Sequence, residues 1–186
     1  MNWNKHYTKS DHAFLSASKY HWINYDETKL KEAWRSYRAA QEGTAIHAWA
    51  AETIRLGIMQ KKSKATVNAY VNDAIGFGMT PEVLLYYSEN CFGTADAIAF
   101  NEKEKFLRIH DLKTGKIPAH MEQLMIYSAL FCLDYDQKPG DIDCELRIYQ
   151  NDEIVIYEPT TEEISHIMSK IITFDKKINK LKLMEG

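Results

Sequence analysis

The sequence is poor in cysteine and proline and contains no long apolar run, and each shortage excludes a class of protein. The chain of 186 residues has three cysteines without C-x-x-C spacing, which suggests neither a disulfide framework nor a zinc or iron–sulfur site. We therefore expect a reducing, cytoplasmic setting. No apolar stretch approaches the roughly 18 to 20 residues of a membrane span, and the polar N-terminus predicts no signal peptide.

Linker-like segments and excess positive charge are missing as well. No segment rich in proline and glycine divides the chain, so we expect one domain over residues 1–186. The net charge of -3 gives no general attraction to nucleic acid, so any such binding must be local. Lysines do gather at 60–64, at Lys113 with Lys116, and along the last predicted helix. For that helix a solvated face is the simpler interpretation.

The pattern of apolar residues predicts an α/β (α+β) fold with a central mixed sheet of about five strands. A helical N-terminal part over 1–78 begins near a cap at Ser10 or Asp11. A sheet core with a crossover helix follows over 83–159, and a C-terminal helix fills 160–186. Because a helix separates the two groups of strands, parallel pairing is possible and helices should cover the sheet. The predicted helical segments are 9–23, 26–40, 41–59, 65–75, 117–133 and 161–183, and the predicted strands are 83–89, 91–100, 105–112, 141–150 and 154–159.

The segment "RIHDLKTGKI" (108–117) carries the clearest chemical signal. Its "TGK" resembles part of a phosphate-binding loop, but that motif needs an earlier glycine and a hydroxyl after the lysine. His110 and Ile117 occupy those places. The phosphate-loop interpretation therefore fails.

A metal site at a strand end fits the same residues better. Asp111 and Lys113 lie two apart and share one face of a strand, and Asp96 lies across the predicted hairpin at a similar distance from its tip. Two neighbouring carboxylates repel unless a cation lies between them, and oxygen ligands suit Mg²⁺ or Mn²⁺. Lys113 would offset charge on a phosphoryl group, the Leu112 carbonyl would be a further ligand, and Lys116 would contact backbone phosphate.

Four segments in order resemble the nuclease core of the PD-(D/E)XK superfamily, in its RecB-like and RecE-like exonuclease branch. They are "EGTAIHAWAAE", "FGTADAIAF", "IHDLKTGK" and "EQLMIYSAL", spanning about Gly43 to Tyr127. The resemblance implies a restriction-endonuclease-like core and a phage-type exonuclease. It implies metal binding by His47, Asp96 and Asp111, catalysis by Asp96, Asp111 and Lys113, and DNA contacts from Gln123 and Tyr127.

The resemblance also implies one or two Mg²⁺ or Mn²⁺ ions and linear DNA ends as the partner, with a single-strand annealing or other recombination protein as a further partner in a bacterial host cell. Three cysteines cannot hold the four-cysteine iron–sulfur cluster of CRISPR-associated relatives, so no cluster is expected. Where many relatives have a metal-binding glutamate, this chain has Ala51. Glu52 points elsewhere on the helix and is not assigned, and Glu89 is a candidate for the missing carboxylate.

Two other functions stay open at this point. A structure-specific endonuclease would use the same core, and a nucleic-acid-binding module would keep the residues without cutting. The individual residues also have plain structural interpretations. Asp111 with Lys113 could form an ion pair of small energetic value, and His47, Gln123 and Tyr127 could be packing residues. A purely structural role explains Asp96 less well, because burying a carboxylate among small apolar residues is costly unless it is paired or bound to metal.

Overall fold

The computed structural model describes residues 13–185, so the predicted cap at Ser10 or Asp11 lies outside the described residues. The chain forms two compact units, Met1–Thr44 and Ala45–Gly186. The first contains a 3-10 helix, η1 (Ala17–Asn24), and the beginning of helix α1 (Glu27–Arg55). The second contains the rest of α1 and all of the elements that follow.

Helix α1 is continuous over the junction at residues 40 and 41, where the sequence pattern predicted two helices. Most residues around this junction, "RAAQE", are strong helix formers, and a single Gly43 inside a helix costs only about 1 kcal/mol. The helix ends at Arg55 instead of the predicted residue 59. Gly57 takes a φ of 65°, and the Ile58 amide donates to the Thr53 carbonyl, which closes the helix end.

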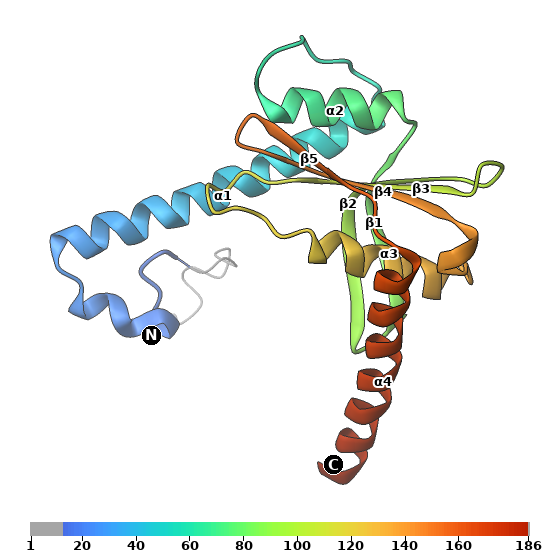
Figure 1. Cartoon of the computed structure of the whole chain (residues 1–186). Coiled ribbons are helices and arrows are strands. Elements are labelled where there is room, and N and C mark those ends of the chain that lie inside the picture. The colour runs from blue at the N-terminus through green and yellow to red at the C-terminus, as the bar shows by residue number, and fades with distance from the viewer. Residues whose placement is uncertain (1–12, 186) are drawn as a thin grey trace, which may run out of the picture. The chain divides into compact units, whose positions relative to one another are not determined.

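A mixed five-stranded sheet in the order β1-β2-β3-β4-β5 confirms the predicted fold class. Neighbouring strands pair antiparallel except β3 and β4, which are parallel and are joined through helix α3 (Figure 1). The strands are β1 (Thr80–Ser88), β2 (Cys91–Asn101), β3 (Phe106–Leu112), β4 (Asp143–Gln150) and β5 (Glu153–Tyr157). The helices of this unit that follow α1 are α2 (Thr66–Gly76), α3 (Glu122–Asp134) and α4 (Thr161–Glu185), with a short 3-10 turn η2 (Pro139–Asp141).

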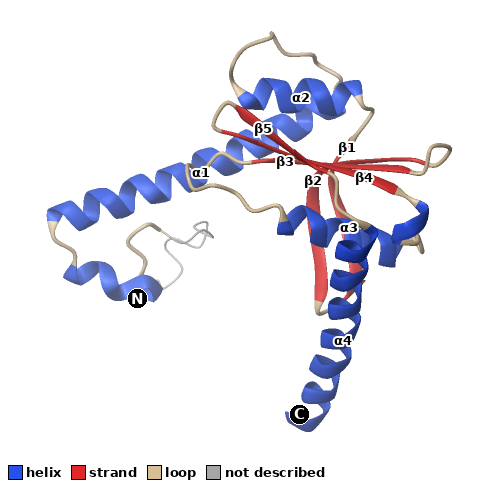
Figure 2. Ribbon diagram, viewed as in Figure 1, coloured by secondary structure: helices blue, strands red, loops and turns tan. Residues whose placement is uncertain are grey.

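Helices cover both faces of the sheet. Figure 2 shows α2 on one side of the strands and α3 on the other. On the α3 side, Leu107, Ile109 and Leu146 are fully buried beneath Leu124 and Leu130. On the α2 side a smaller core holds residues from α1, α2 and the strands: Ala50, Ile54, Tyr70, Val71, Ala74, Met79, Ala97, Leu112 and Tyr149. The two cores fix the position of the strand ends on which the candidate site is built.

Within residues 13–185 the three cysteines form no disulfide, and none of the helices is a candidate membrane span. Cys91, Cys132 and Cys144 are all free. Burial raises the pKa of Cys132 to about 11 and that of Cys144 to about 12, so both stay protonated thiols near neutral pH. No helix in this range combines the length and the apolar content needed to cross a membrane.

His110 is a buried structural residue. Its side chain is 0% exposed, packs edge-on against Phe77 and has Nδ1 3.3 Å from the Tyr149 hydroxyl. Burial, with the charges of Arg147 and Arg108, lowers the pKa of His110 to about 3 from its ordinary 6.5. The imidazole is therefore neutral in the folded protein.

This burial makes stability depend on pH. Between about pH 6.5 and 3 the unfolded chain binds a proton at His110 that the folded chain does not, so stability falls as pH decreases below 6.5, by at most about 1.4 kcal/mol per pH unit. Urea unfolding at pH 7, 6 and 5 should therefore show a shallower loss for His110→Gln than for wild type. Equal slopes would mean that His110 does not carry this dependence.

Candidate metal centre

Three acidic residues on neighbouring strands meet near one end of the sheet. Pro81 pairs with Ala97 and Val83 with Ala95, which puts Glu82 of β1 opposite Asp96 of β2. On the other side of β2, Ala97 pairs with His110, so the next step of the register brings Asp96 beside Asp111 of β3. The predicted approach of Asp96 and Asp111 across the hairpin is thus present, and Glu82 extends the row.

Asp96 is the centre of this arrangement. Its Oδ2 accepts a hydrogen bond from the Leu112 amide at 2.9 Å and lies 3.3 Å from Nδ1 of His47 on α1. His47, Glu82 and Asp96 each place one potential ligand atom within 4.8 Å of the others. A histidine nitrogen and two carboxylates at this spacing are a donor set that a divalent cation accepts.

Asp111 lies beside this group, and its carboxylate is held by lysine. The residue is 2% exposed, and Lys113 Nζ donates to Oδ1 at 3.1 Å while lying 3.0 Å from Oδ2. Only the Oδ1 contact has hydrogen-bond geometry, and the buried Oδ2 has no hydrogen-bond partner among the described residues. Lys113 therefore supplies positive charge beside both oxygens, although Oδ2 accepts no hydrogen bond from residues 13–185.

The pKa shifts in this cluster reflect burial together with neighbouring negative charge. Burial raises the pKa of the Asp111 carboxyl, and the neighbouring Asp96 charge adds to the rise. The hydrogen bond with Asp96 raises the pKa of His47, although burial opposes it. Burial also raises the pKa of Tyr70, with contributions from Asp96, Glu82 and Asp111. A cation at this place would offset the repulsion among the carboxylates, so the residues fit a metal ion.

Glu82 was missed by the sequence interpretation, which began the first strand at residue 83. Glu82 has a φ of 56°, a left-handed conformation that is uncommon for glutamate and costs about 1–3 kcal/mol. It supplies a carboxylate that the sequence interpretation sought in Glu89. Glu89 instead accepts a hydrogen bond from the Tyr86 hydroxyl, and Glu52 is exposed beside Arg55.

We expect opposite effects of Glu82 substitution on metal binding and on stability. Glu82→Gly removes a ligand and relieves the left-handed backbone, so it should weaken Mn²⁺ binding while raising the stability of the metal-free protein by about 1 kcal/mol. Glu82→Gln removes the charge and keeps the backbone conformation, so it should weaken Mn²⁺ binding without that gain from the backbone. Calorimetric Mn²⁺ titration and urea unfolding in EDTA measure the two effects. Unchanged Mn²⁺ affinity in both variants would exclude Glu82 as a ligand.

Gln123 and Tyr127 of α3, whose DNA contacts stay a prediction from the resemblance, are connected to Lys113 by hydrogen bonds. Lys113 Nζ donates to Gln123 Oε1 at 2.8 Å, and Gln123 Nε2 donates to the Tyr127 hydroxyl at 3.1 Å. Gly93 of β2 permits this arrangement, since a Cβ there would lie 2.9 Å from Tyr127 Cε1. The chain of contacts fixes the lysine between Asp111 and α3.

Two residues that the sequence predicted for this site, Lys116 and Leu112, have fewer contacts with it. Lys116 is exposed on the loop after β3 and makes no ion pair with the residues that the structure describes. Leu112 is buried and contributes its amide to Asp96, while a role for its carbonyl as a ligand stays a prediction.

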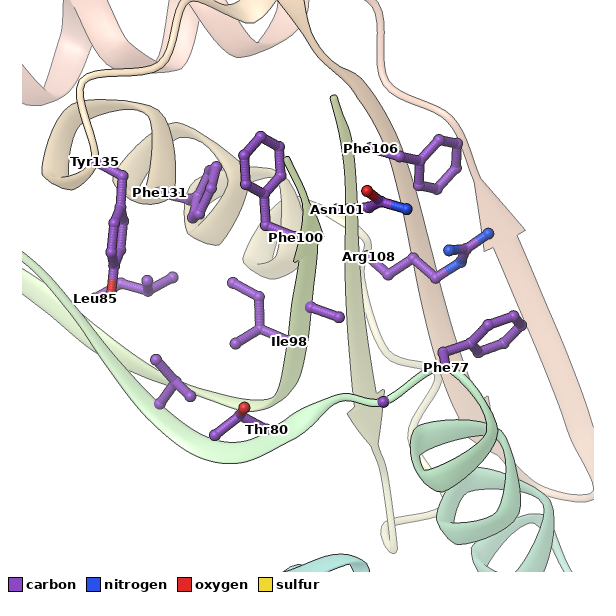
Figure 3. A pocket seen from close by; sticks show the side chains of 13 residues that line it. Phe77, Thr80, Leu85, Ile98, Phe100, Asn101, Phe106, Arg108, Phe131 and Tyr135 are labelled. Atoms are coloured by element: carbon purple, nitrogen blue, oxygen red, sulfur yellow. The ribbon is translucent and has the colours of Figure 1, made fainter. Parts of the chain in front are cut away.

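The cavity in Figure 3 is separate from the acidic cluster. It has a volume of ≈ 550 Å³ and is lined mainly by apolar and aromatic residues, among them Phe100, Phe131 and Tyr135, together with Arg108. None of the predicted site residues lines it. We place the chemistry at the acidic cluster and not in this cavity, because reactive groups and not volume determine what a site can do. Comparison of the chain with models of known families and with curated protein sequences finds no match.

Proposed function

We propose that this protein is a metal-dependent deoxyribonuclease that hydrolyses DNA phosphodiester bonds, most of all as an exonuclease acting on DNA ends. The observation that carries the proposal is the meeting of Glu82, Asp96 and His47 within 4.8 Å, next to a lysine held on a buried carboxylate. A plain ion pair would account for Asp111 and Lys113. It would not account for the other acids or for the strained backbone of Glu82.

The residues divide into cation holders and a phosphate-facing lysine. Glu82, Asp96 and His47 would hold a Mg²⁺ or Mn²⁺ ion, and Asp111, next to Asp96 in the strand register, would add a carboxylate beside them. When bound, such an ion supplies positive charge that polarises a phosphoryl oxygen. Lys113 has three donor hydrogens, of which Asp111 and Gln123 take two. The third is free for a phosphoryl oxygen or the attacking water, where it would stabilise negative charge as the bond breaks.

The choice of DNA ends rests on the resemblance of the four segments to RecB-like and RecE-like exonucleases. The net charge of -3 means that attraction to the phosphate backbone must come from local groups. Exposed Lys116 and the lysines at 61, 62 and 64 lie on the loops after β3 and before α2. A single-strand annealing or other recombination protein would be a partner of such an enzyme in a phage or other mobile element.

Digestion of labelled DNA tests the proposal. Linear single-stranded and double-stranded DNA and covalently closed circles are incubated with Mg²⁺, Mn²⁺ or EDTA. We expect loss of linear DNA alone, only with metal, and with mononucleotides or short oligonucleotides as products. Comparison of single-stranded with double-stranded DNA gives the strand preference in the same experiment.

Two outcomes would replace the proposal. Cutting of closed circles would assign the same site to an endonuclease, because an exonuclease needs an end. Absence of cleavage with every metal, in a protein shown to be folded, would favour a nucleic-acid-binding module. Such a module would bind DNA equally well in EDTA.

A further inference from the structure

A cavity of ≈ 360 Å³ adjoins Lys113 on the side of α1. Its walls come from four places in the second unit: α1, the residues that open α2, the end of β3 and the turn between β4 and β5. The residues that matter here are Ile46, Trp49, Thr66, Lys113, Thr114 and Asn151. Its size lies within the range of small-ligand sites, about 300–1,000 Å³.

One turn of α1 contributes residues both to the candidate metal site and to the wall of this cavity. Ile46 and Trp49 are three residues apart and therefore share a face of the helix, while His47 on the same turn contacts Asp96. Lys113 likewise lines the cavity and donates to Asp111. A group held in the cavity would thus lie next to a phosphate at Lys113.

The lining combines a flat aromatic surface with hydrogen-bonding groups. Trp49 is 44% exposed, although burial of a large aromatic side chain is favourable. Ile46 and Val67 add apolar surface, and Thr66, Thr114 and Asn151 add donors and acceptors. A planar, partly polar ring is the chemical class that such a lining accepts, and aromatic side chains bind nucleobases of any sequence by stacking.

We propose that this cavity takes one unpaired nucleobase of the strand being cut, stacked on Trp49, and that the preferred substrate is accordingly a single-stranded end. The inference rests on the proposed nuclease function and specifies its substrate. A base in a duplex is paired and stacked, and it must leave the helix before it can enter a pocket. A blunt duplex should therefore be cut more slowly than the same strand alone.

An abasic scan tests this assignment. The probes are fluorescein-labelled dT12 and a set of dT12 strands in which one nucleotide at a time is abasic, with binding followed by fluorescence anisotropy in Ca²⁺ and cleavage followed in Mg²⁺. For wild type we expect one or two abasic positions to weaken binding about 5- to 100-fold. Trp49→Ala should bind intact dT12 more weakly by a similar factor and should no longer distinguish those abasic strands. Trp49→Phe should restore part of the discrimination, and Phe174→Ala, an exposed aromatic outside this cavity, should behave as wild type.

The outcomes separate the inference from the function on which it rests. A flat abasic scan in wild type would overturn the base pocket, and so would an equal loss for intact and abasic strands in Trp49→Ala. If wild type still cleaves dT12 with Mg²⁺ in those cases, the nuclease function stands and only the pocket is wrong. If wild type neither binds nor cleaves any of the strands, the base pocket is wrong, and the digestion of linear double-stranded DNA then decides the nuclease function.

Discussion

Replacing Lys113 by alanine should lower the rate of metal-dependent DNA cleavage at saturating metal and DNA by at least about 100-fold, the usual effect of losing one charge-stabilising group. Lys113 Nζ is held by Asp111 and Gln123, so its remaining hydrogen is fixed in direction before substrate arrives. The loss should fall on kcat more than on KM, because the charge it offsets develops during the reaction. Single-turnover cleavage of labelled linear DNA measures it.

A matched lysine shows whether the effect is specific. Lys103 lies exposed at the tip between β2 and β3, and Lys103→Ala should cleave as wild type. Removing Lys113 also leaves the buried Asp111 carboxylate without its cation, so circular dichroism must show that the variant is folded. Full activity of folded Lys113→Ala with metal saturated would exclude the mechanism proposed above.

Replacing Asp111 by asparagine should abolish stabilisation by metal while making the metal-free protein more stable. In wild type, Mg²⁺ or Mn²⁺ at 100 times its Kd should add about 2.7 kcal/mol, or about 5 to 10 °C in Tm for a chain of this size. Asp111→Asn removes the negative charge facing the cation, so this shift should largely disappear. Thermal unfolding in EDTA and in a metal series measures both effects.

The rise in metal-free stability follows from the position of the Asp111 carboxyl. Burial and the Asp96 charge raise its pKa, so at pH 7 the folded state is penalised for keeping it ionised. This stability difference shrinks as pH falls, because protonation of wild type removes the penalty, and the two proteins should converge under acid conditions. Asp143→Asn, a change in an exposed residue at the start of β4, should alter neither quantity. A metal shift that survives in Asp111→Asn would place the ion on His47, Glu82 and Asp96 alone.

The predicted and observed positions of Asp96, Asp111 and Lys113 agree where local pattern decides the geometry. Alternation along residues 105–112 put Asp111 and Lys113 on one face, and the structure has their side chains in contact. Counting from the hairpin tip brought Asp96 toward Asp111, because an antiparallel register is set by its turn. Gln123 and Tyr127 are four residues apart and therefore share a helical face, and the structure has a hydrogen bond between them.

The sequence by itself therefore determined the order of the elements, the mixed sheet and most of the acidic cluster, since these follow from periods of 2 and 3.6 residues and from short turns. Only the tertiary structure decided that Glu82 joins the cluster, because that depends on a left-handed residue within β1 and on the pairing of β1 with β2. It alone also decided that Trp49 borders a cavity at Lys113. That cavity is made by segments far apart in the chain, and their approach results from packing rather than from any local pattern.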